Sequence, residues 1–207
     1  LDLAAEVCNR RGWDVKFQPI EWASKDMELE SGTIDCIWNG FTMSADRIDQ
    51  YEWSDAYVDN SQVFIVKSDS GIAAQADLAG KIVAVQAASS ALEALEAEES
   101  AALLGSFKEL IQVPDYNTAF MYLESGAAEA IAMDIGVAKF QMAERGADKF
   151  VVLEEKLVSE LYGVGFLKGN TELRDQVQET LYEMVKDGKF DEIAKKWDLQ
   201  DCVVLGK

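Results

Sequence analysis

Apolar and polar residues alternate with helical and strand-like spacing along the whole chain. Residues 1–11 place apolar side chains on one helical face and stop at Gly12, which favours a left-handed helix end. Residues 13–17 then alternate like a half-buried strand, which Pro19 ends. The chain is therefore predicted to begin with a helix and a strand.

The same alternation continues to the end of the chain. Further strands are predicted at 34–38, 62–66, 81–85, 110–113, 130–133, 151–153 and 164–166. Helices are predicted at 24–29, after Ser44, from Ser90, from Asn117, before Gly146, at 171–186 and at 189–197. Strands that alternate with helices in this way are typical of an α/β protein.

One stretch of sequence occurs twice. Residues 29–32 and residues 123–126 are both Leu-Glu-Ser-Gly, and each copy is followed by an acidic residue, a predicted strand and a polar loop. This echo indicates two similar α/β lobes. Because ligands of such sheets bind beyond the carboxyl ends of the strands, we expect the functional residues in the loops 39–44, 86–90 and 133–135.

Composition narrows the range of functions. The 207 residues are 49% hydrophobic, which is enough for a core, and their formal charge of −19 disfavours nucleic-acid and anionic membrane partners. The chain has no histidine, which excludes Ser-His and Cys-His triads and most zinc sites, so no metal or cofactor is expected. Cys8, Cys36 and Cys202 lie far apart without CxxC spacing, which predicts three free thiols, with Cys36 buried in a strand.

Polar residues that suit a carboxylate follow the strand predicted at 34–38. Thr42, Ser44 and the amides of residues 40–45 form a group of donors at the start of a predicted short helix, with Arg47 one turn inside. The alternative is that Ser44 only caps this helix and that Arg47 is a solvated surface residue.

Two later loops carry further candidate ligand groups. Ser89 and Ser90 present hydroxyls at another helix start, where Ser90 and Glu93 have capping-box spacing. Asp134 ends an apolar strand and suits an ammonium group. For both loops the alternative is an ordinary helix cap.

Trp22 follows a loop that contains a proline, and it is a candidate aromatic pocket wall, with burial in a core as the alternative. Lys25, Asp26 and Glu28 are interpreted as a solvated helix face. Taken together, the candidates supply an arginine and hydroxyls for a carboxylate, a carboxylate for an ammonium group, and an aromatic wall. A free amino acid needs these groups.

Several motifs in combination resemble one known family. They are Ser31-Gly32-Thr33-Ile34-Asp35, Gly40-Phe41-Thr42-Met43-Ser44-Ala45-Asp46-Arg47, Trp53-Ser54-Asp55-Ala56-Tyr57, Asp77-Leu78-Ala79-Gly80-Lys81, Tyr162-Gly163-Val164-Gly165 and Asp187-Gly188-Lys189-Phe190. Over nearly its whole length the chain resembles the polar amino acid-binding proteins of bacterial ABC importers, solute-binding protein family 3. The resemblance implies the α/β type II periplasmic binding protein fold, in which two lobes, each a mostly parallel sheet flanked by helices, are joined by a two-strand hinge.

The resemblance also implies the division of the chain. Lobe 1 is expected to comprise residues 1–61 and 165–207, and lobe 2 residues 62–164. The hinge is expected near residues 58–63 and 162–166. The C-terminal helices are expected on lobe 1, because they follow the returning strand.

Carried over by position, the resemblance assigns the carboxylate site. Arg47 and Thr42 would hold the α-carboxylate of the ligand. Ser90 and the amide around Ser89 would join them from the second lobe.

The resemblance assigns the remaining ligand groups in the same way. Asp134 would hold the α-ammonium group with help from the Gly40 carbonyl. Trp22 would line the pocket for the ligand side chain, with Asn39 and Met133 as adjacent candidates.

The sequence departs from the family pattern in two places. Ala88 stands where the family loops usually carry glycine. Family members also begin with a strand and an aromatic loop before a Gly-Phe-Asp-x-Asp-Leu-Ala helix, and this chain starts near the end of that motif. We therefore expect one strand and one pocket wall to be absent, either because the chain is a fragment or because another chain completes the edge.

The function that the resemblance implies is extracytoplasmic binding of a free amino acid between two closing lobes and delivery to an ABC transporter membrane permease, without catalysis. The expected place is the periplasm or the extracellular face of the bacterial membrane. No signal segment is present in this sequence, and a lipid anchor would lie outside it.

Two alternatives remain open at this point. One is the ligand-sensing domain of a receptor, because the same fold forms such domains. The other is an enzyme similar to cyclohexadienyl dehydratases, with Glu160 as the candidate acid.

Overall fold

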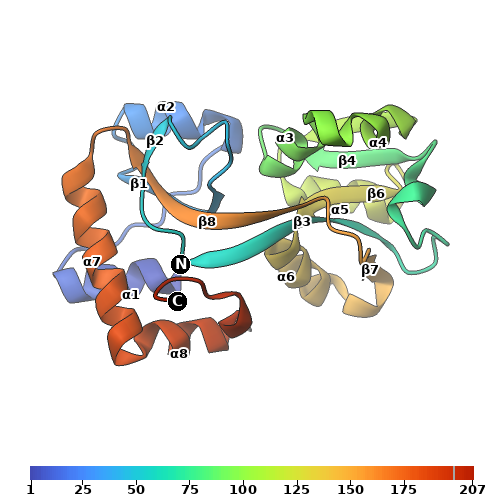
Figure 1. Cartoon of the computed structure of the whole chain (residues 1–207). Coiled ribbons are helices and arrows are strands. Elements are labelled where there is room, and N and C mark those ends of the chain that lie inside the picture. Colours follow the sequence, from blue (N-terminus) through green and yellow to red (C-terminus); the bar gives the residue numbers. More distant parts are fainter. Residues whose placement is uncertain (198) are drawn as a thin grey trace. The chain divides into compact units, whose positions relative to one another are not determined.

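The computed structural model describes residues 1–197 and 199–207. Contacts between segments that lie far apart in the sequence group the chain into two compact units. Unit 1 comprises Leu1–Ile20, Ser24–Asp59 and Glu160–Lys207, and unit 2 comprises Glu21–Ala23 and Asn60–Ser159. Apart from the short segment Glu21–Ala23, the chain passes from unit 1 to unit 2 within the long strand β3 (Val58–Lys67) and returns within the long strand β8 (Val158–Leu167) (Figure 1).

Helices α1 (Asp2–Arg11), α7 (Thr171–Asp187) and α8 (Lys189–Lys196) of unit 1 pack around one apolar core. Helix α1 ends at Gly12, whose φ of 68° is the left-handed conformation that the sequence predicts. It packs against α7 and α8 (Figure 1). The core of this unit includes Val7, Val58, Val164, Phe166, Val177, Leu181, Met184 and Phe190.

The described strand pairs within unit 1 are antiparallel. Strands β1 (Cys36–Thr42) and β2 (Tyr51–Trp53) both pair with β8, and the register of β1 shifts between Ile37 and Phe41. The expectation of a mostly parallel sheet in this lobe is therefore wrong for these pairs. A parallel neighbour for β1 needs a preceding strand and a helical crossover, and the segment before α2 (Lys25–Glu30) does not supply that strand.

The strand predicted at residues 13–17 is not formed. These residues carry neither helix nor strand, and Val15 and Phe17 are 42% and 48% exposed. An alternating pattern gives a strand only where a neighbouring strand satisfies its backbone groups and covers its apolar face.

Unit 2 contains a mixed sheet with the strand order β3-β6-β4-β5. Strand β4 (Ile82–Gln86) is parallel to β5 (Glu109–Val113) and to β6 (Ala130–Asp134). Strand β3 is antiparallel to β6 and to β7 (Phe150–Val152). The parallel pairs occur where helices connect the strands, as the alternating pattern predicts.

Helices cover both faces of this sheet. Helix α3 (Ser90–Glu96) supplies Ala91, Leu92 and Leu95 to the core on one face, and α4 (Ala101–Ser106) packs beside it (Figure 1). Helices α5 (Tyr116–Ser125) and α6 (Ile135–Arg145) supply Phe120, Leu123 and Ala138 to the core on the other face.

All three cysteines are free in the structure and each is partly buried. Cys36 begins β1, and burial raises the pKa of its thiol to about 12, with smaller contributions from Asp35 and Cys8. No helix among the described residues is long and apolar enough to cross a bilayer.

Candidate ligand-binding site

Arg47 lies in unit 1 and is buried, with 4% exposure. It follows β1 in a series of turns rather than in the predicted short helix. The amides of Arg47 and Ile48 both donate to the Ser44 carbonyl and that of Gln50 donates to the Arg47 carbonyl, and these turns do not continue as a helix. Its guanidinium lies 5.1 Å from the centroid of the Phe41 ring. The alternative interpretation of Arg47 as a solvated surface residue is therefore wrong.

Ser44 does not act as a helix cap at this place. Its hydroxyl oxygen is buried and has no hydrogen-bond partner among the residues that the structure describes. The predicted group of donors at a helix N-terminus is thus replaced by a turn that carries a buried hydroxyl and a buried guanidinium.

An aromatic cluster that the sequence reasoning missed supports Arg47. Phe41 stacks on Trp53 with ring centroids 4.8 Å apart, and Tyr51 meets Phe41 edge-on at 5.0 Å. The indole of Trp53 also donates to the Arg47 carbonyl at 3.3 Å. The sequence contains the aromatic residues of β1 and β2, but it does not show that their rings contact one another in the folded chain.

Thr42 is buried at the end of β1, with 4% exposure. Its hydroxyl donates to Oε1 of Glu160 at 2.8 Å. The amide of Met43 donates to the Leu161 carbonyl at 2.9 Å, which continues the pairing with β8 beyond the strand. Thr42 and Glu160 therefore belong to one local arrangement within unit 1.

Residues 39–42 form the second half of β1 and not the start of a loop as predicted. The strand continues because the register shift lets Phe41 and Thr42 pair with β8. Gly40 has a φ of 86°, and a Cβ there would meet the Tyr162 ring at 3.0 Å. Asn39 is exposed.

Asp134 lies in unit 2 and is 6% exposed. Its Oδ1 accepts from the amide of Val137 at 2.9 Å and caps α6, and its Oδ2 accepts from the side chain of Asn60 at 2.7 Å. The helix-cap alternative is therefore confirmed. Each carboxylate oxygen has two acceptor positions, so capping and ligand binding are compatible.

Ser89 and Ser90 have different roles at the start of α3. Ser89 Oγ accepts from the amide of Leu92 at 3.2 Å and donates to the Gln86 carbonyl at 2.8 Å. The predicted capping box of Ser90 and Glu93 is therefore wrong. The helix begins at Ser90, so the residue that caps it is Ser89. Ser90 Oγ accepts from Nε2 of Gln62 at 3.1 Å.

The loop before α3 has a left-handed residue at Ala88, with a φ of 55°. Glycine adopts this conformation without strain, whereas alanine adopts it at a cost of about 1 kcal/mol. The indole of Trp22 donates to the Ala88 carbonyl at 2.9 Å, and the half-buried Trp22 packs with unit 2.

Two side chains, those of Met133 and Lys25, are more buried than the sequence suggested. Met133 is fully buried in the core between the unit 2 sheet and α5 and α6, which leaves its main chain for any ligand contact. Lys25 is 7% exposed and lies 3.6 Å from Asp26, whose carboxylate accepts from the Tyr51 hydroxyl. The interpretation of Lys25 as part of a solvated face is therefore wrong.

Among the described residues, no group of three or more metal-ligating side chains could hold a metal ion. The candidate polar groups are an arginine and a threonine hydroxyl in unit 1, and serine hydroxyls, a carboxylate and an indole in unit 2. Two α/β units, linked by two long strands and carrying these groups, define a solute-binding protein with the periplasmic binding protein fold.

The sequence matches the bacterial extracellular solute-binding proteins, family 3, over residues 1–200, and the chain belongs to this family. The ABC transporter glutamine-binding protein of Bacillus subtilis (strain 168) is 27% identical over 206 residues, which are 97% of this chain and 72% of that protein. An L-cystine-binding protein of Escherichia coli (strain K12) is 26% identical over 199 residues, which are 95% of this chain and 72% of the relative.

Solved structures extend the comparison. An ABC uptake transporter substrate-binding protein from Streptococcus pneumoniae with bound histidine has a TM-score of 0.92 and 33% identity, covering 98% of this chain and 83% of that chain. An ancestral arginine-binding protein bound to glutamine has a TM-score of 0.84 and 30% identity, and the match covers 95% of this chain and 85% of that chain. The chain is thus an amino acid-binding protein of the ABC importer class and not an enzyme.

Proposed function

We propose that this protein binds one free L-α-amino acid outside the cytoplasmic membrane and delivers it to an ABC transporter permease. The observation that carries the proposal is the burial of Arg47. Arg47 is 4% exposed and its guanidinium lies over the Phe41 ring, so the group is held in one orientation, as a two-pronged carboxylate bond requires.

In this proposal the α-carboxylate is held by Arg47, with the Ser90 hydroxyl and the Ser89 amide as further donors. Ser90 supports this role because its Oγ accepts from Gln62, so its own proton is directed away from that bond. Ser89 is proposed to contribute its amide, since its hydroxyl already caps α3. Thr42 is treated separately below because of its bond to Glu160.

The α-ammonium group is proposed to bind Asp134 and the Gly40 carbonyl. Asp134 supports this role because it is buried and oriented by two hydrogen bonds, and a carboxylate can accept more than two. Trp22 and Asn39 are proposed to contact the ligand side chain, and Met133 would contribute through its main chain only.

The proposed contacts come from both units. A ligand that takes donors from unit 1 and an acceptor from unit 2 binds best to a state in which both reach it, and it shifts the population toward that state. We propose that the permease recognises this ligand-bound state. Attachment to the membrane through a lipid anchor would place the protein beside the permease.

The proposal is tested by calorimetric titration with L-glutamine, L-arginine, L-histidine and L-cystine. Arg47→Ala is expected to lose about 2–5 kcal/mol in affinity, and Arg47→Lys is expected not to restore binding, because an ammonium group cannot form the planar fork. Asp134→Asn is expected to weaken binding as well, since it removes the charge opposite the ammonium group.

Arg145→Ala is the matched control, because Arg145 also stacks on a phenylalanine, Phe120, at 5.2 Å but is not assigned to the ligand. It should leave affinity unchanged. Because Arg47 is buried, we also expect a lower melting temperature for Arg47→Ala, so affinity is measured well below that temperature. Unchanged affinity in both Arg47 variants would contradict the carboxylate assignment.

A further inference from the structure

The hydrogen bond between Thr42 and Glu160 restricts what Thr42 can offer to a ligand. A threonine hydroxyl has one proton, and here that proton is donated to Oε1 of Glu160 at 2.8 Å. An ionised carboxylate only accepts hydrogen bonds, so the direction of this bond is determined by chemistry. Toward any other group Thr42 then presents lone pairs, which suit a donor and not a carboxylate.

Ser90 has the opposite arrangement. The side-chain amide of Gln62 donates to Ser90 Oγ at 3.1 Å, so that bond uses a lone pair of the hydroxyl and directs its proton toward an acceptor elsewhere. Of the two hydroxyls that the family resemblance assigns to the carboxylate, one is thus arranged as a donor and the other as an acceptor.

The main chain holds the Thr42–Glu160 pair in place. Thr42 pairs with Tyr162 across the strands, and the next amide, that of Met43, donates to the Leu161 carbonyl. Thr42 is 4% exposed, which limits the room for its side chain to rotate. The hydrogen bond between Thr42 and Glu160 therefore lies where β1 pairs with β8, and the paired backbone holds it in place.

We propose that Glu160 is a positioning residue that keeps Thr42 in the acceptor state and thereby lowers the affinity for the amino acid. This inference rests on the proposed function. Arg47 and Ser90 then carry the α-carboxylate, while the Thr42 hydroxyl contributes to carboxylate binding only when its bond to Glu160 is released.

The test is a double-mutant cycle with Thr42→Val, Glu160→Gln and the combined variant, using whichever of L-glutamine, L-arginine, L-histidine and L-cystine binds the wild type most tightly. Thr42→Val alone is expected to change the dissociation constant less than twofold. Glu160→Gln is expected to tighten binding about five- to tenfold, because its amide can donate to Thr42 as Gln62 donates to Ser90. The combined variant should lose this gain.

A second readout separates positioning from a general structural effect. The α-carboxamide of the same amino acid carries N–H donors that suit the acceptor state of Thr42. Glu160→Gln should therefore raise the ratio of the affinity for the amino acid to the affinity for its α-carboxamide. Loosened packing alone would change both affinities together and leave this ratio unchanged. Glu192→Gln removes one negative charge from an exposed ion pair with Lys189 and should change neither quantity.

A tenfold loss in Thr42→Val with Glu160 in place would overturn the inference, because Thr42 would then donate to the ligand despite Glu160. A gain in Glu160→Gln that persists in the combined variant would also overturn it, since charge alone would explain the effect. Glu160→Ala is the second variant if Glu160→Gln does not fold. If Arg47→Ala and Ser90→Ala have no effect, the proposed site itself fails, which is a distinguishable result.

Discussion

Gly40 shows how one residue shapes the candidate site. Its φ of 86° is strained for any other residue, and a Cβ would lie 3.0 Å from the Tyr162 ring. Gly40→Ala is therefore expected to lower the free energy of unfolding by about 2 kcal/mol or more, measured by urea denaturation. The same change is expected to weaken amino acid binding, because it moves the strand that carries Thr42.

Gly32→Ala is the matched control for this prediction. Gly32 has a similar φ of 72°, but nothing lies within 4 Å of the position that a Cβ would take there. Its substitution should cost only the backbone strain, about 1 kcal/mol, and leave binding unchanged. Equal losses in both variants would show that the contact with Tyr162 has no energetic effect.

At the scale of an element, the start of α3 depends on a single cap. Ser89→Ala removes the acceptor for the amide of Leu92, and we expect a loss of about 1 kcal/mol in unfolding free energy. Ser100→Ala is the control, because Ser100 precedes α4 without a side-chain cap bond. A loss of equal size at Ser100, seen in urea denaturation, would contradict the assignment of the cap.

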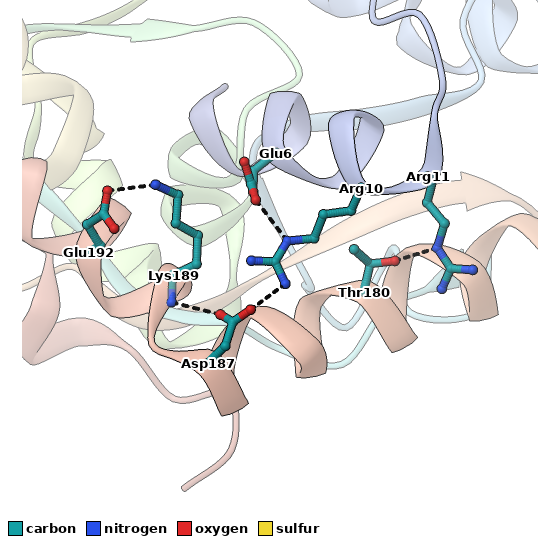
Figure 2. A network of polar contacts seen from close by, with 7 residues as sticks. All are labelled: Glu6, Arg10, Arg11, Thr180, Asp187, Lys189 and Glu192. Atoms are coloured by element: carbon teal, nitrogen blue, oxygen red, sulfur yellow. Dashed lines mark hydrogen bonds and ion pairs between the residues drawn. The ribbon is translucent and has the colours of Figure 1, made fainter.

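Helix α1 is joined to α7 by side chains that lie far apart in the sequence (Figure 2). Arg10 donates to Glu6 at 2.8 Å and to Asp187 at 2.7 Å, and it lowers the pKa of Asp187 below its ordinary value of 3.8. Because the folded-state pKa is the lower one, this stabilisation is present above pH 3.8 and is lost as the pH falls through the folded-state pKa.

Arg10→Gln is therefore expected to lower the melting temperature at pH 7, and the difference from wild type should shrink as the pH falls below 3.8. Lys67→Gln is the control, since Lys67 and Asp69 form a looser, exposed pair at 3.6 Å. A difference for Arg10→Gln that stays constant with pH would show that packing, not the ion pair, is responsible.

At the scale of the whole molecule, the formal charge of −19 opposes compaction. Salt screens this repulsion, so the melting temperature at neutral pH is expected to rise between low and moderate sodium chloride concentrations. Local ion pairs such as those of Arg10 weaken in salt and act in the opposite direction. A melting temperature that falls with added salt would mean that these pairs outweigh the net repulsion.

The sequence by itself determined the elements whose signals are local. The helix that ends at Gly12, the apolar strands of unit 2 and the cap at Asp134 each depend on residues within a few positions of one another. The family and the candidate residues Arg47 and Asp134 could likewise be read from motifs in the chain.

Only the tertiary structure decided which segments meet. Residues 13–17 alternate like a strand but remain without one, and Arg47 is buried on Phe41 instead of solvated. The bond from Thr42 to Glu160 joins residues that lie far apart in the sequence of unit 1. The physical reason is that a local pattern records the preference of a segment, whereas burial and hydrogen-bond direction depend on partners that only the folded chain brings into contact.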